Sequence, residues 1–338
     1  MRRPVGLIVV CLGAFCLSLA PLVRFYVAEQ VVKAPLNRFQ TTRLEARNAT
    51  YFDLAELKPR SGATLRATTI VRGDVRANGG NDDIAVWDST TTVVDIANPD
   101  RPLQISGFRI AFDRRTSRLV RCCGANVDGD TSVRMSGYGL LFPIADVRKR
   151  DYPFFDMTTR RPVPMRYSGE DEVRGVRTYR FVQRVPETKT STIGVRLPAR
   201  MLGMDPRLPD QKVDRYSAIT VTMWVDPRTG IPVRQRQDIS STVRTPDGRG
   251  RMTVASADLV TMPESERSLV DTANAGALKI EAARSWVPFG TFLLGLALLL
   301  LGVIAGLLGS RRSARSGPPA PRRSDGRFGA PAASSRHR

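Results

Sequence analysis

Two long apolar runs near the two ends of the chain constrain its fold more than any other feature. The first, residues 5–23, has nineteen residues without a charge, and the second, residues 286–308, has twenty-three. A helix needs about 20 apolar residues to cross a hydrocarbon layer of roughly 30 Å, because each residue adds only about 1.5 Å. Both runs come close to or exceed this length, so the sequence predicts a transmembrane helix near each end.

The first run has a second interpretation. A basic start followed by apolar residues is also typical of a cleaved secretory signal peptide, whose apolar core is about 7–15 residues long and ends in small residues. Here the run is longer, and no clear small-x-small site precedes Ala28. We therefore predict an uncleaved signal anchor over residues 5–27 and a second helix over residues 286–308, with cleavage as the alternative.

Basic residues flank both runs and predict their orientation. Arg2 and Arg3 precede the first run, and residues 309–338 after the second run contain eight arginines. Positive residues close to a span stay on the cytoplasmic side. We expect a two-pass cell-membrane protein with residues 1–4 and 309–338 cytoplasmic and residues 28–285 extracytoplasmic. The basic tail is rich in Pro, Ser, Gly and Ala, a composition that predicts disorder.

The formal net charge of +20 raises the question of nucleic-acid binding. Part of this excess lies in the tail, and the rest is spread along the chain without forming a basic stripe. A domain outside the cytoplasm also meets no genomic DNA, so we expect no nucleic-acid partner. The expected partner is the lipid bilayer itself. A lipid or an envelope glycopolymer as ligand, and a homo-oligomer, stay open.

Short alternating runs dominate the segment between the two apolar stretches. Thr, Val, Tyr and Trp recur at every second position, separated by Gly, Pro, Asn and Asp, which is typical of antiparallel strands and turns. About ten strands are indicated, the clearest at residues 63–71, 85–96, 107–112, 117–121, 178–182, 218–225, 231–243 and 250–255. Helical spacing is confined to residues 28–44 and 263–285.

The predicted fold class is mainly β (α+β). It consists of one large antiparallel β-rich extracytoplasmic domain, a curved sheet or barrel around a cavity, flanked by the two terminal transmembrane helices. No Pro- or Ser-rich linker divides residues 28–285, so we expect a single core there.

The histidine content limits the catalytic and metal-binding chemistry that the external domain can have. The chain has one histidine, His337, in the tail, so His-dependent hydrolysis and His-ligated zinc are excluded from the external domain. Two acidic clusters, residues 170–172 and residues 126–130, are more typical of charged or Asp-Gly turns than of paired catalytic carboxylates or a calcium loop. We predict no enzyme, no cofactor and no metal.

The cysteines fall into two pairs. Cys11 and Cys16 lie inside the first apolar run, where they are small apolar residues. Cys122 and Cys123 are adjacent in the external domain, where thiols tend to oxidise. They either close a vicinal disulfide or remain reduced and buried.

Residues 121–167 contain a concentration of aromatic and aliphatic side chains among glycines and prolines. Such clusters are usually ordinary core. The alternative is the lining of an apolar cavity, or a membrane-facing lip. The candidate residues are Tyr138, Leu140, Leu141, Phe142, Tyr152, Phe154 and Phe155.

Several motifs carry a resemblance to a known family. They are RCCGANVDGD (residues 121–130), SGYGLLFP (136–143), YPFFD (152–156), GEDEVRGVRTYRF (169–181) and WVDPRTGIPV (224–233). The chain resembles an actinobacterial membrane family with a domain of unknown function, known as porin PorA-like. The resemblance implies a cell-envelope protein. Outer-membrane porins, however, are barrels without apolar spanning helices, and the present layout is closer to that of the CD36 class of lipid receptors.

Four functions follow from these observations. We expect first an external domain that binds or transfers a lipid or another apolar envelope component. The alternatives are a porin-like channel-forming envelope protein and a non-catalytic structural scaffold. An enzyme, such as a glycosidase or another carboxylate-dependent hydrolase, is a further alternative, and the absence of histidine from the external domain weighs against it.

Overall fold

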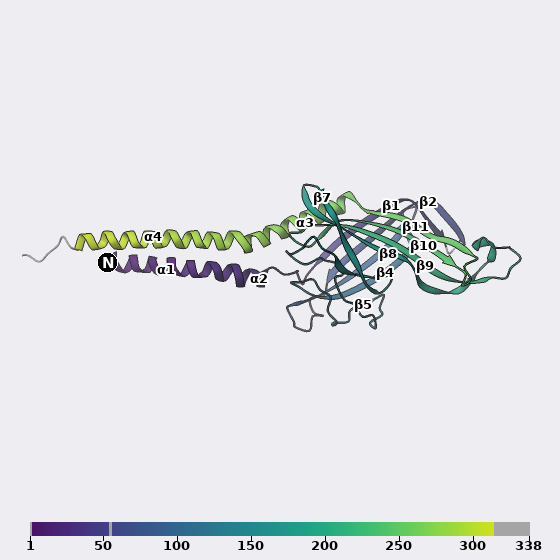
Figure 1. Ribbon diagram of the computed structural model, residues 1–338, viewed down its shortest axis with the longest axis horizontal. Coiled ribbons are helices and arrows are strands. Elements are labelled where there is room, and N and C mark those ends of the chain that lie inside the picture. Colours follow the sequence, from purple (N-terminus) through teal and green to yellow (C-terminus); the bar gives the residue numbers. More distant parts are fainter. Residues whose placement is uncertain (1, 54–55, 314–338) are drawn as a thin grey trace, which may run out of the picture. The chain divides into compact units, whose positions relative to one another are not determined.

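The chain forms two compact units in the computed structural model, which describes residues 2–53 and 56–313. The helical unit consists of α1 (Arg2–Leu22) and α4 (Val287–Ser313). The β-rich unit extends from Val23 to Trp286 (Figure 1). Two helices in the described residues are long and apolar enough to cross a membrane. The predicted flanking helices are therefore present, whereas the predicted orientation stays a prediction, and most of the predicted disordered tail lies outside the described residues.

Two glycines bring α1 and α4 close together. A Cβ atom added at Gly13 would lie 2.7 Å from the backbone nitrogen of Leu299, and one added at Gly295 would lie 2.9 Å from the carbonyl oxygen of Gly13. Small residues allow such backbone approach between apolar helices, where packing rather than hydrophobicity drives association. The two ends of the chain thus form a packed helix pair.

The β-rich unit is built on one antiparallel sheet, which contains eleven strands among the described residues. Its order is β5-β4-β3-β2-β1-β11-β10-β9-β8-β7-β6. The strands are β1 (Phe39–Asp53), β2 (Lys58–Gly73), β3 (Ile84–Asp95), β4 (Asn98–Asp113), β5 (Asn126–Val127), β6 (Tyr152–Asp156), β7 (Arg161–Val173), β8 (Val176–Leu197), β9 (Gln211–Val225), β10 (Pro232–Arg244) and β11 (Arg251–Thr261). The predicted mainly antiparallel β fold is confirmed.

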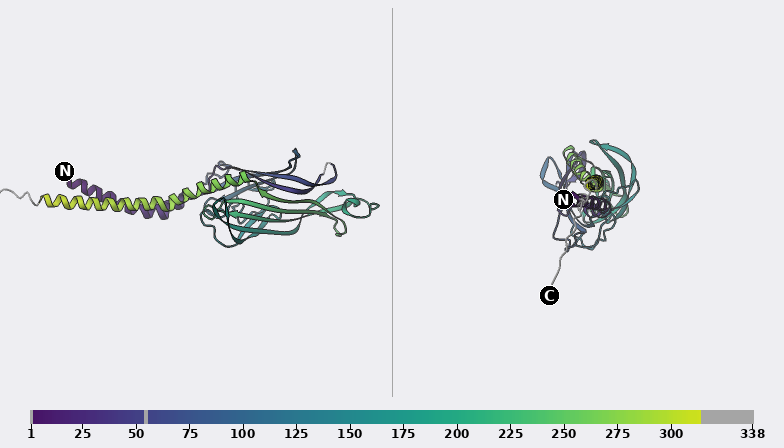
Figure 2. Two further views of the ribbon diagram at one scale, coloured as in Figure 1. Left: turned by 90° about the horizontal axis from the view of Figure 1, so that it is seen from above. Right: turned by 90° about the vertical axis from the view of Figure 1, so that its left-hand side faces the viewer.

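The sheet curves so that β1–β4 face β8–β11 (Figure 2). It does not close into a barrel through strand pairing, since β5 contacts only Phe108 and Arg109 of β4 and the opposite end is β6. At one end, irregular chain connects the two edges. Tyr138 bridges antiparallel to Arg118 and parallel to Phe154, and Leu119 bridges to Phe112.

Two aromatic clusters fill the connected end. One contains Trp87, Phe108, Ile110 and Phe112 from β3 and β4, packed with Phe155. The other contains Tyr138, Phe142, Tyr152, Phe154 and Phe181, with Phe142 and Phe181 fully buried. Ring pairs at centroid distances of 4.7–5.7 Å link the second cluster. These clusters form a dry core at the connected end of the sheet. Their burial stabilises the fold by about 25 cal/mol per Å² of apolar area removed from water.

Helix α3 (Pro263–Glu281) follows the last strand and covers part of the sheet. Its apolar side chains Leu269, Val270 and Ala273 pack on Val173 and Val233. Pro263 occupies the first turn, where a backbone N–H has no acceptor within the helix, so the lack of an N–H in proline costs no helical hydrogen bond. A π-helical turn, Ala282–Trp286, leads on from it. The predicted helix over residues 263–285 is confirmed.

Two local predictions are wrong. Only α2 (Ala28–Val31) and the π-helical turn Val23–Val27 are helical at the start of the β-rich unit, and residues 39–44 of the predicted helix belong to β1. This strand pairs with β2 and with β11, so tertiary hydrogen bonds override the local pattern. The predicted strand at residues 117–121 forms only isolated bridges.

Candidate functional site

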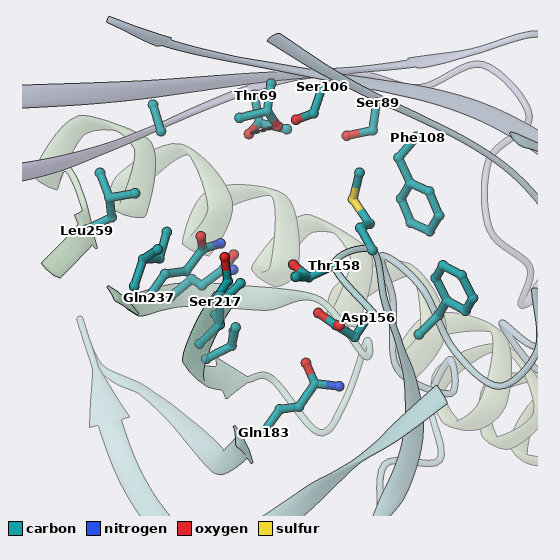
Figure 3. A pocket seen from close by; sticks show the side chains of 18 of the residues that line it. Thr69, Ser89, Ser106, Phe108, Asp156, Thr158, Gln183, Ser217, Gln237 and Leu259 are labelled. Carbon is teal, nitrogen blue, oxygen red and sulfur yellow. Dashed lines mark hydrogen bonds between the residues drawn. The ribbon is translucent and has the colours of Figure 1, made fainter. Parts of the chain in front are cut away.

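A cavity of about 540 Å³ lies between the two halves of the curved sheet. One wall comes from β1–β4 and the other from β8–β11, while the segment from Phe154 to Arg160 closes the end beside the aromatic clusters. In Figure 3, Thr69, Ser89 and Ser106 lie on one wall, with Gln237 and Ser217 across from them.

The lining is rich in uncharged polar side chains. Alternate residues of a strand face the same side of a sheet, and on this inner face many of them are Ser, Thr or Gln. They are Thr69, Ser89, Thr91, Gln104, Ser106, Thr158, Gln183, Thr190, Ser191, Ser217, Gln235 and Gln237. Hydroxyl and amide groups can replace water around a polar solute, so the cavity suits a hydrated or hydrogen-bonding occupant.

One part of the lining is aliphatic. One residue comes from each of five strands that are consecutive in the sheet order, β3-β2-β1-β11-β10, and these residues are Val93, Ala67, Leu44, Leu259 and Ile239. They belong to a hydrophobic cluster that also includes Ala46 and Leu65. The cavity is therefore amphipathic, with an apolar strip beside its polar surface.

Arg215 is the charged residue of β9 that lines the cavity. Its Nε donates a hydrogen bond of 2.9 Å to Ser241 Oγ, and Ser241 is fully buried. Ser241 Oγ also lies 3.1 Å from Ser217 Oγ. Burial lowers the pKa of the Arg215 guanidinium from its ordinary value, because desolvation disfavours the charged form. The group nevertheless stays cationic at neutral pH.

The two carboxylates of the lining have structural roles. Asp156 Oδ2 accepts hydrogen bonds from the backbone N–H and the hydroxyl of Thr159, at 2.7 and 2.6 Å. Asp128 Oδ1 accepts a bond of 2.8 Å from the Gly107 N–H. Asp128 has a φ of 52° and precedes a glycine, as expected for the predicted Asp-Gly turn. Both side chains therefore stabilise turns beside the cavity.

Some of the seven residues considered as a cavity lining do line the cavity, and the others are buried in the core. Leu140, Phe154 and Phe155 line the cavity. Tyr138, Phe142 and Tyr152 are nearly or fully buried in the second aromatic cluster, and Leu141 packs against the first. The aromatic region thus forms mostly the dry end of the sheet, and the sequence did not indicate that polar strand faces would supply most of the lining.

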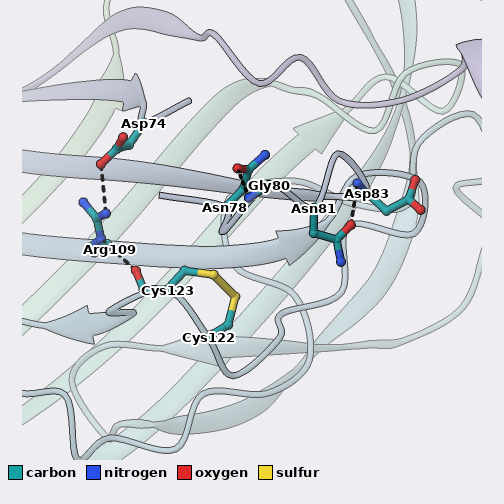
Figure 4. The surroundings of a disulfide bond; sticks show 8 residues. All are labelled: Asp74, Asn78, Gly80, Asn81, Asp83, Arg109, Cys122 and Cys123. Atoms are coloured by element: carbon teal, nitrogen blue, oxygen red, sulfur yellow. Dashed lines mark hydrogen bonds and ion pairs between the residues drawn. A yellow bond between two sulfur atoms is a disulfide. The ribbon is translucent and has the colours of Figure 1, made fainter. Parts of the chain in front are cut away.

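Cys122 and Cys123 form a vicinal disulfide in the structure (Figure 4). The carbonyl oxygen of Cys123 accepts a hydrogen bond of 3.3 Å from Arg109 Nε. The Arg109 guanidinium also forms ion pairs with Asp88 and Asp74, at 2.8 and 2.9 Å. This arginine ties the cysteine loop to β4. The redox state of the pair in the envelope stays a prediction.

The acidic cluster at residues 170–172, predicted as a charged turn, lies instead in strand β7. Glu170 forms ion pairs with Lys149 and Arg177. Asp171 accepts hydrogen bonds from Arg180 Nη1 at 3.0 Å and Trp224 Nε1 at 2.7 Å. The turn comes after it, between β7 and β8. These carboxylates cross-link neighbouring strands and do not line the cavity.

Comparison with known proteins identifies the family. Residues 5–304 match the family described as Porin PorA. This chain belongs to the Porin PorA family. Among its relatives is the Porin PorA of Corynebacterium resistens, which is 22% identical over an alignment that covers 91% of the present chain and 97% of the relative. The resemblance inferred from the motifs is confirmed, and membership supports a membrane-associated, porin-like protein of the cell envelope.

The outer face of strand β10 in this PorA-family chain is charged. On β10, Arg234, Arg236 and Asp238 alternate with the inward-facing Gln235 and Gln237. A charge on the lipid-facing side of a transmembrane barrel costs about 2–4 kcal/mol at the bilayer midplane. The outer face of β10 therefore suits water, and two helices among the described residues are long and apolar enough to cross a membrane.

Proposed function

We propose that this PorA-family chain is a porin-like envelope protein, held in the membrane by α1 and α4, whose sheet cavity admits and conducts small hydrophilic solutes. The observation that carries the proposal is the lining of uncharged polar side chains in the cavity, which six different strands supply. A porin-like role needs a solvated path with hydrogen-bonding walls. The proposal assigns the chain no catalytic role.

Free edges beside the cavity offer a route for solutes. Strand β7 pairs with β8 only as far as Gln183, and β5 pairs with β4 only at Phe108 and Arg109. The remaining outer edges, residues 98–107 of β4 and 184–197 of β8, carry no strand partner among the described residues. Gln104 of β4 and Ser191 of β8, on these edges, both line the cavity.

Narrowing the cavity tests the proposal. Gln237 lines it and makes no side-chain hydrogen bond within the described part of the chain. Gln237→Trp should therefore narrow the cavity without removing a side-chain hydrogen bond. We expect the full-length protein to conduct ions in planar bilayers and the variant to conduct less than half as much, because a constriction limits ion passage.

Ser240→Trp is the matched control. Ser240 is exposed on the same strand and faces the other side of the sheet. We expect wild-type conductance from this variant. No conductance by the wild-type protein, or equal conductance by the two tryptophan variants, would contradict the proposal.

The aliphatic strip favours a second candidate function, the binding or transfer of a lipid. Leu44, Val93 and Ile239 could contact an acyl chain, while the facing hydroxyl groups bind a polar head. Native mass spectrometry of the full-length protein tests this candidate. Retained lipid that Ile239→Asp removes would support it, and a lipid-free wild-type spectrum would exclude it.

A further inference from the structure

The cavity lining carries two arginines and two aspartates, Asp128 and Asp156, and neither of these arginines forms an ion pair with either aspartate among the described residues. The two arginines are Arg160 and Arg215. Arg160 forms an ion pair of 2.7 Å with Asp130. Arg215 has no carboxylate partner in the described part of the chain, and its one side-chain hydrogen bond is to the neutral Ser241. The positive charge of Arg215 is therefore not bound by a carboxylate among the described residues.

Ser241 also fixes the direction of this charge. Because Nε is the atom that donates to Ser241 Oγ, the two terminal nitrogens of the guanidinium are left for other partners. The carbonyl oxygen of Arg215 accepts a bond of 3.3 Å from Thr190 Oγ1 on the neighbouring strand. The backbone and the inner end of the side chain are thus both held, while the outer end is not.

The lining next to Arg215 can complete an anion site. Ser191 lies opposite Arg215 in the β8–β9 register, and Ser217 is two residues further on the same face of β9. A hydroxyl group donates to an anion readily, and a guanidinium binds two oxygens of a phosphate or carboxylate side by side.

We propose that Arg215, with the hydroxyl groups of Ser191 and Ser217, forms a binding site for a phosphate or carboxylate group and makes the cavity select anions. The inference rests on the proposed function, because it names the class of solute that the cavity takes. The anionic group comes from a free solute or from a lipid headgroup, and the experiment separates the two sources.

Ion selectivity of the full-length protein in planar bilayers is the first measurement. We expect the wild-type protein to favour chloride over potassium and Arg215→Gln to lower this permeability ratio about tenfold, since one charge focused in a narrow low-dielectric cleft raises the local counter-ion concentration by about that factor. Arg215→Lys should retain most of the selectivity. Arg184→Gln removes a charge from an exposed position outside the cavity lining and should leave the ratio unchanged.

Direct binding is the second measurement. Inorganic phosphate is titrated into the detergent-solubilised full-length protein, and phosphatidylglycerol retention is compared with phosphatidylcholine retention by native mass spectrometry. Phosphate binding that Arg215→Gln abolishes and Arg215→Lys keeps supports a free anion. Selective retention of phosphatidylglycerol with the same dependence supports a lipid headgroup.

The outcomes separate the two proposals. Conductance with unchanged selectivity in Arg215→Gln, and no binding that depends on this residue, would overturn the anion site alone. Absence of conductance, with Arg215-dependent phosphate binding intact, would overturn the proposed channel function and leave the anion site standing.

Discussion

At the scale of single residues, Glu266 joins α3 to the sheet. Its side chain is 8% exposed and forms ion pairs with Arg174 at 2.7 Å and Arg234 at 2.5 Å. Burial by itself would raise the pKa of Glu266, but the hydrogen bonds and charges of the two arginines outweigh it and hold the pKa below 4.5. The carboxylate thus bridges two arginines, one in the turn after β7 and one in β10, at the point where the helix meets the sheet.

Glu266→Gln should lower the free energy of unfolding by about 1–2 kcal/mol, less than for a fully buried pair because the arginines are about one third exposed. A lowered folded-state pKa gives stability that is present above about pH 4.5 and is lost as the pH falls through the folded value. Chemical denaturation at neutral and acidic pH measures both effects. The variant should lose less stability on acidification than the wild type.

Asp146→Asn is the control at this scale. It removes a carboxylate whose ion pair with Arg148 is more than half exposed on both sides. We expect a change of less than about 0.5 kcal/mol, as for most exposed pairs. Equal effects of the two substitutions would mean that Glu266 has no special role.

At the scale of elements, the pairing of α1 with α4 depends on close backbone approach. A Cβ atom at Gly295 would lie 3.0 Å from Cys16 Cβ and 2.9 Å from the carbonyl oxygen of Gly13, so the helices must separate slightly to admit it. That shift moves the two Cβ atoms toward the separation of about 3.5–4.5 Å found in disulfides. A Cβ atom at Gly290 of the same helix meets nothing within 4 Å. The two positions therefore give a test of the pairing with its own control.

We expect Gly295→Cys to form a disulfide with Cys16 on mild oxidation, in a protein whose Cys11 is replaced by Ala. Mass spectrometry of non-reduced peptides would detect the bond. Gly290→Cys should form none. The same measurement tests the predicted signal anchor, because a cleaved first segment could not form the bond. Equal cross-linking at both positions, or none at either, would contradict the packed pair.

At the scale of the whole molecule, the basic flanks and the two apolar helices predict that both termini are cytoplasmic. Ser61 is exposed in β2, and Ser316 lies in the tail outside the described residues. In a protein with Cys11 and Cys16 replaced by Ala, a membrane-impermeant maleimide should label Ser61→Cys in intact cells and Ser316→Cys only after lysis. Labelling of Ser316→Cys in intact cells would reverse the topology.

The sequence predicts an element correctly where local interactions stabilise that element, and it fails where the element depends on distant segments of the chain. Helix α3 is predicted well because Leu269 and Ala273 stand four residues apart, and a proline marks its start. Strand β1 is missed because neither of its partners lies in the same segment: it pairs with β2, and also with β11, more than 200 residues away in the chain, as between Leu44 and Thr261. A pattern within one segment does not contain that partner.

The candidate site could be predicted only in part from the sequence, for the same reason. Residues such as Gln235 and Gln237 alternate visibly in the sequence, yet alternation alone does not say whether a polar face meets bulk water or another strand. The sequence favours ordinary core for the aromatic residues around Tyr138, with a cavity lining as the alternative, and most of them fill the dry end of the sheet. Burial, which depends on all the strands together, decided between these roles.

The two apolar runs, the strand alternation and the family motifs are local properties, so the sequence alone determined a mainly β protein of the Porin PorA family with an apolar helix near each end. Only the tertiary structure decided that α1 packs on α4, that Tyr138 connects the sheet edges, and that Arg215 lies in the cavity without a carboxylate partner among the described residues. The reason is that each of these depends on which distant segments meet. Strand order sets those meetings, and hydrogen bonding and burial across the whole sheet set the strand order.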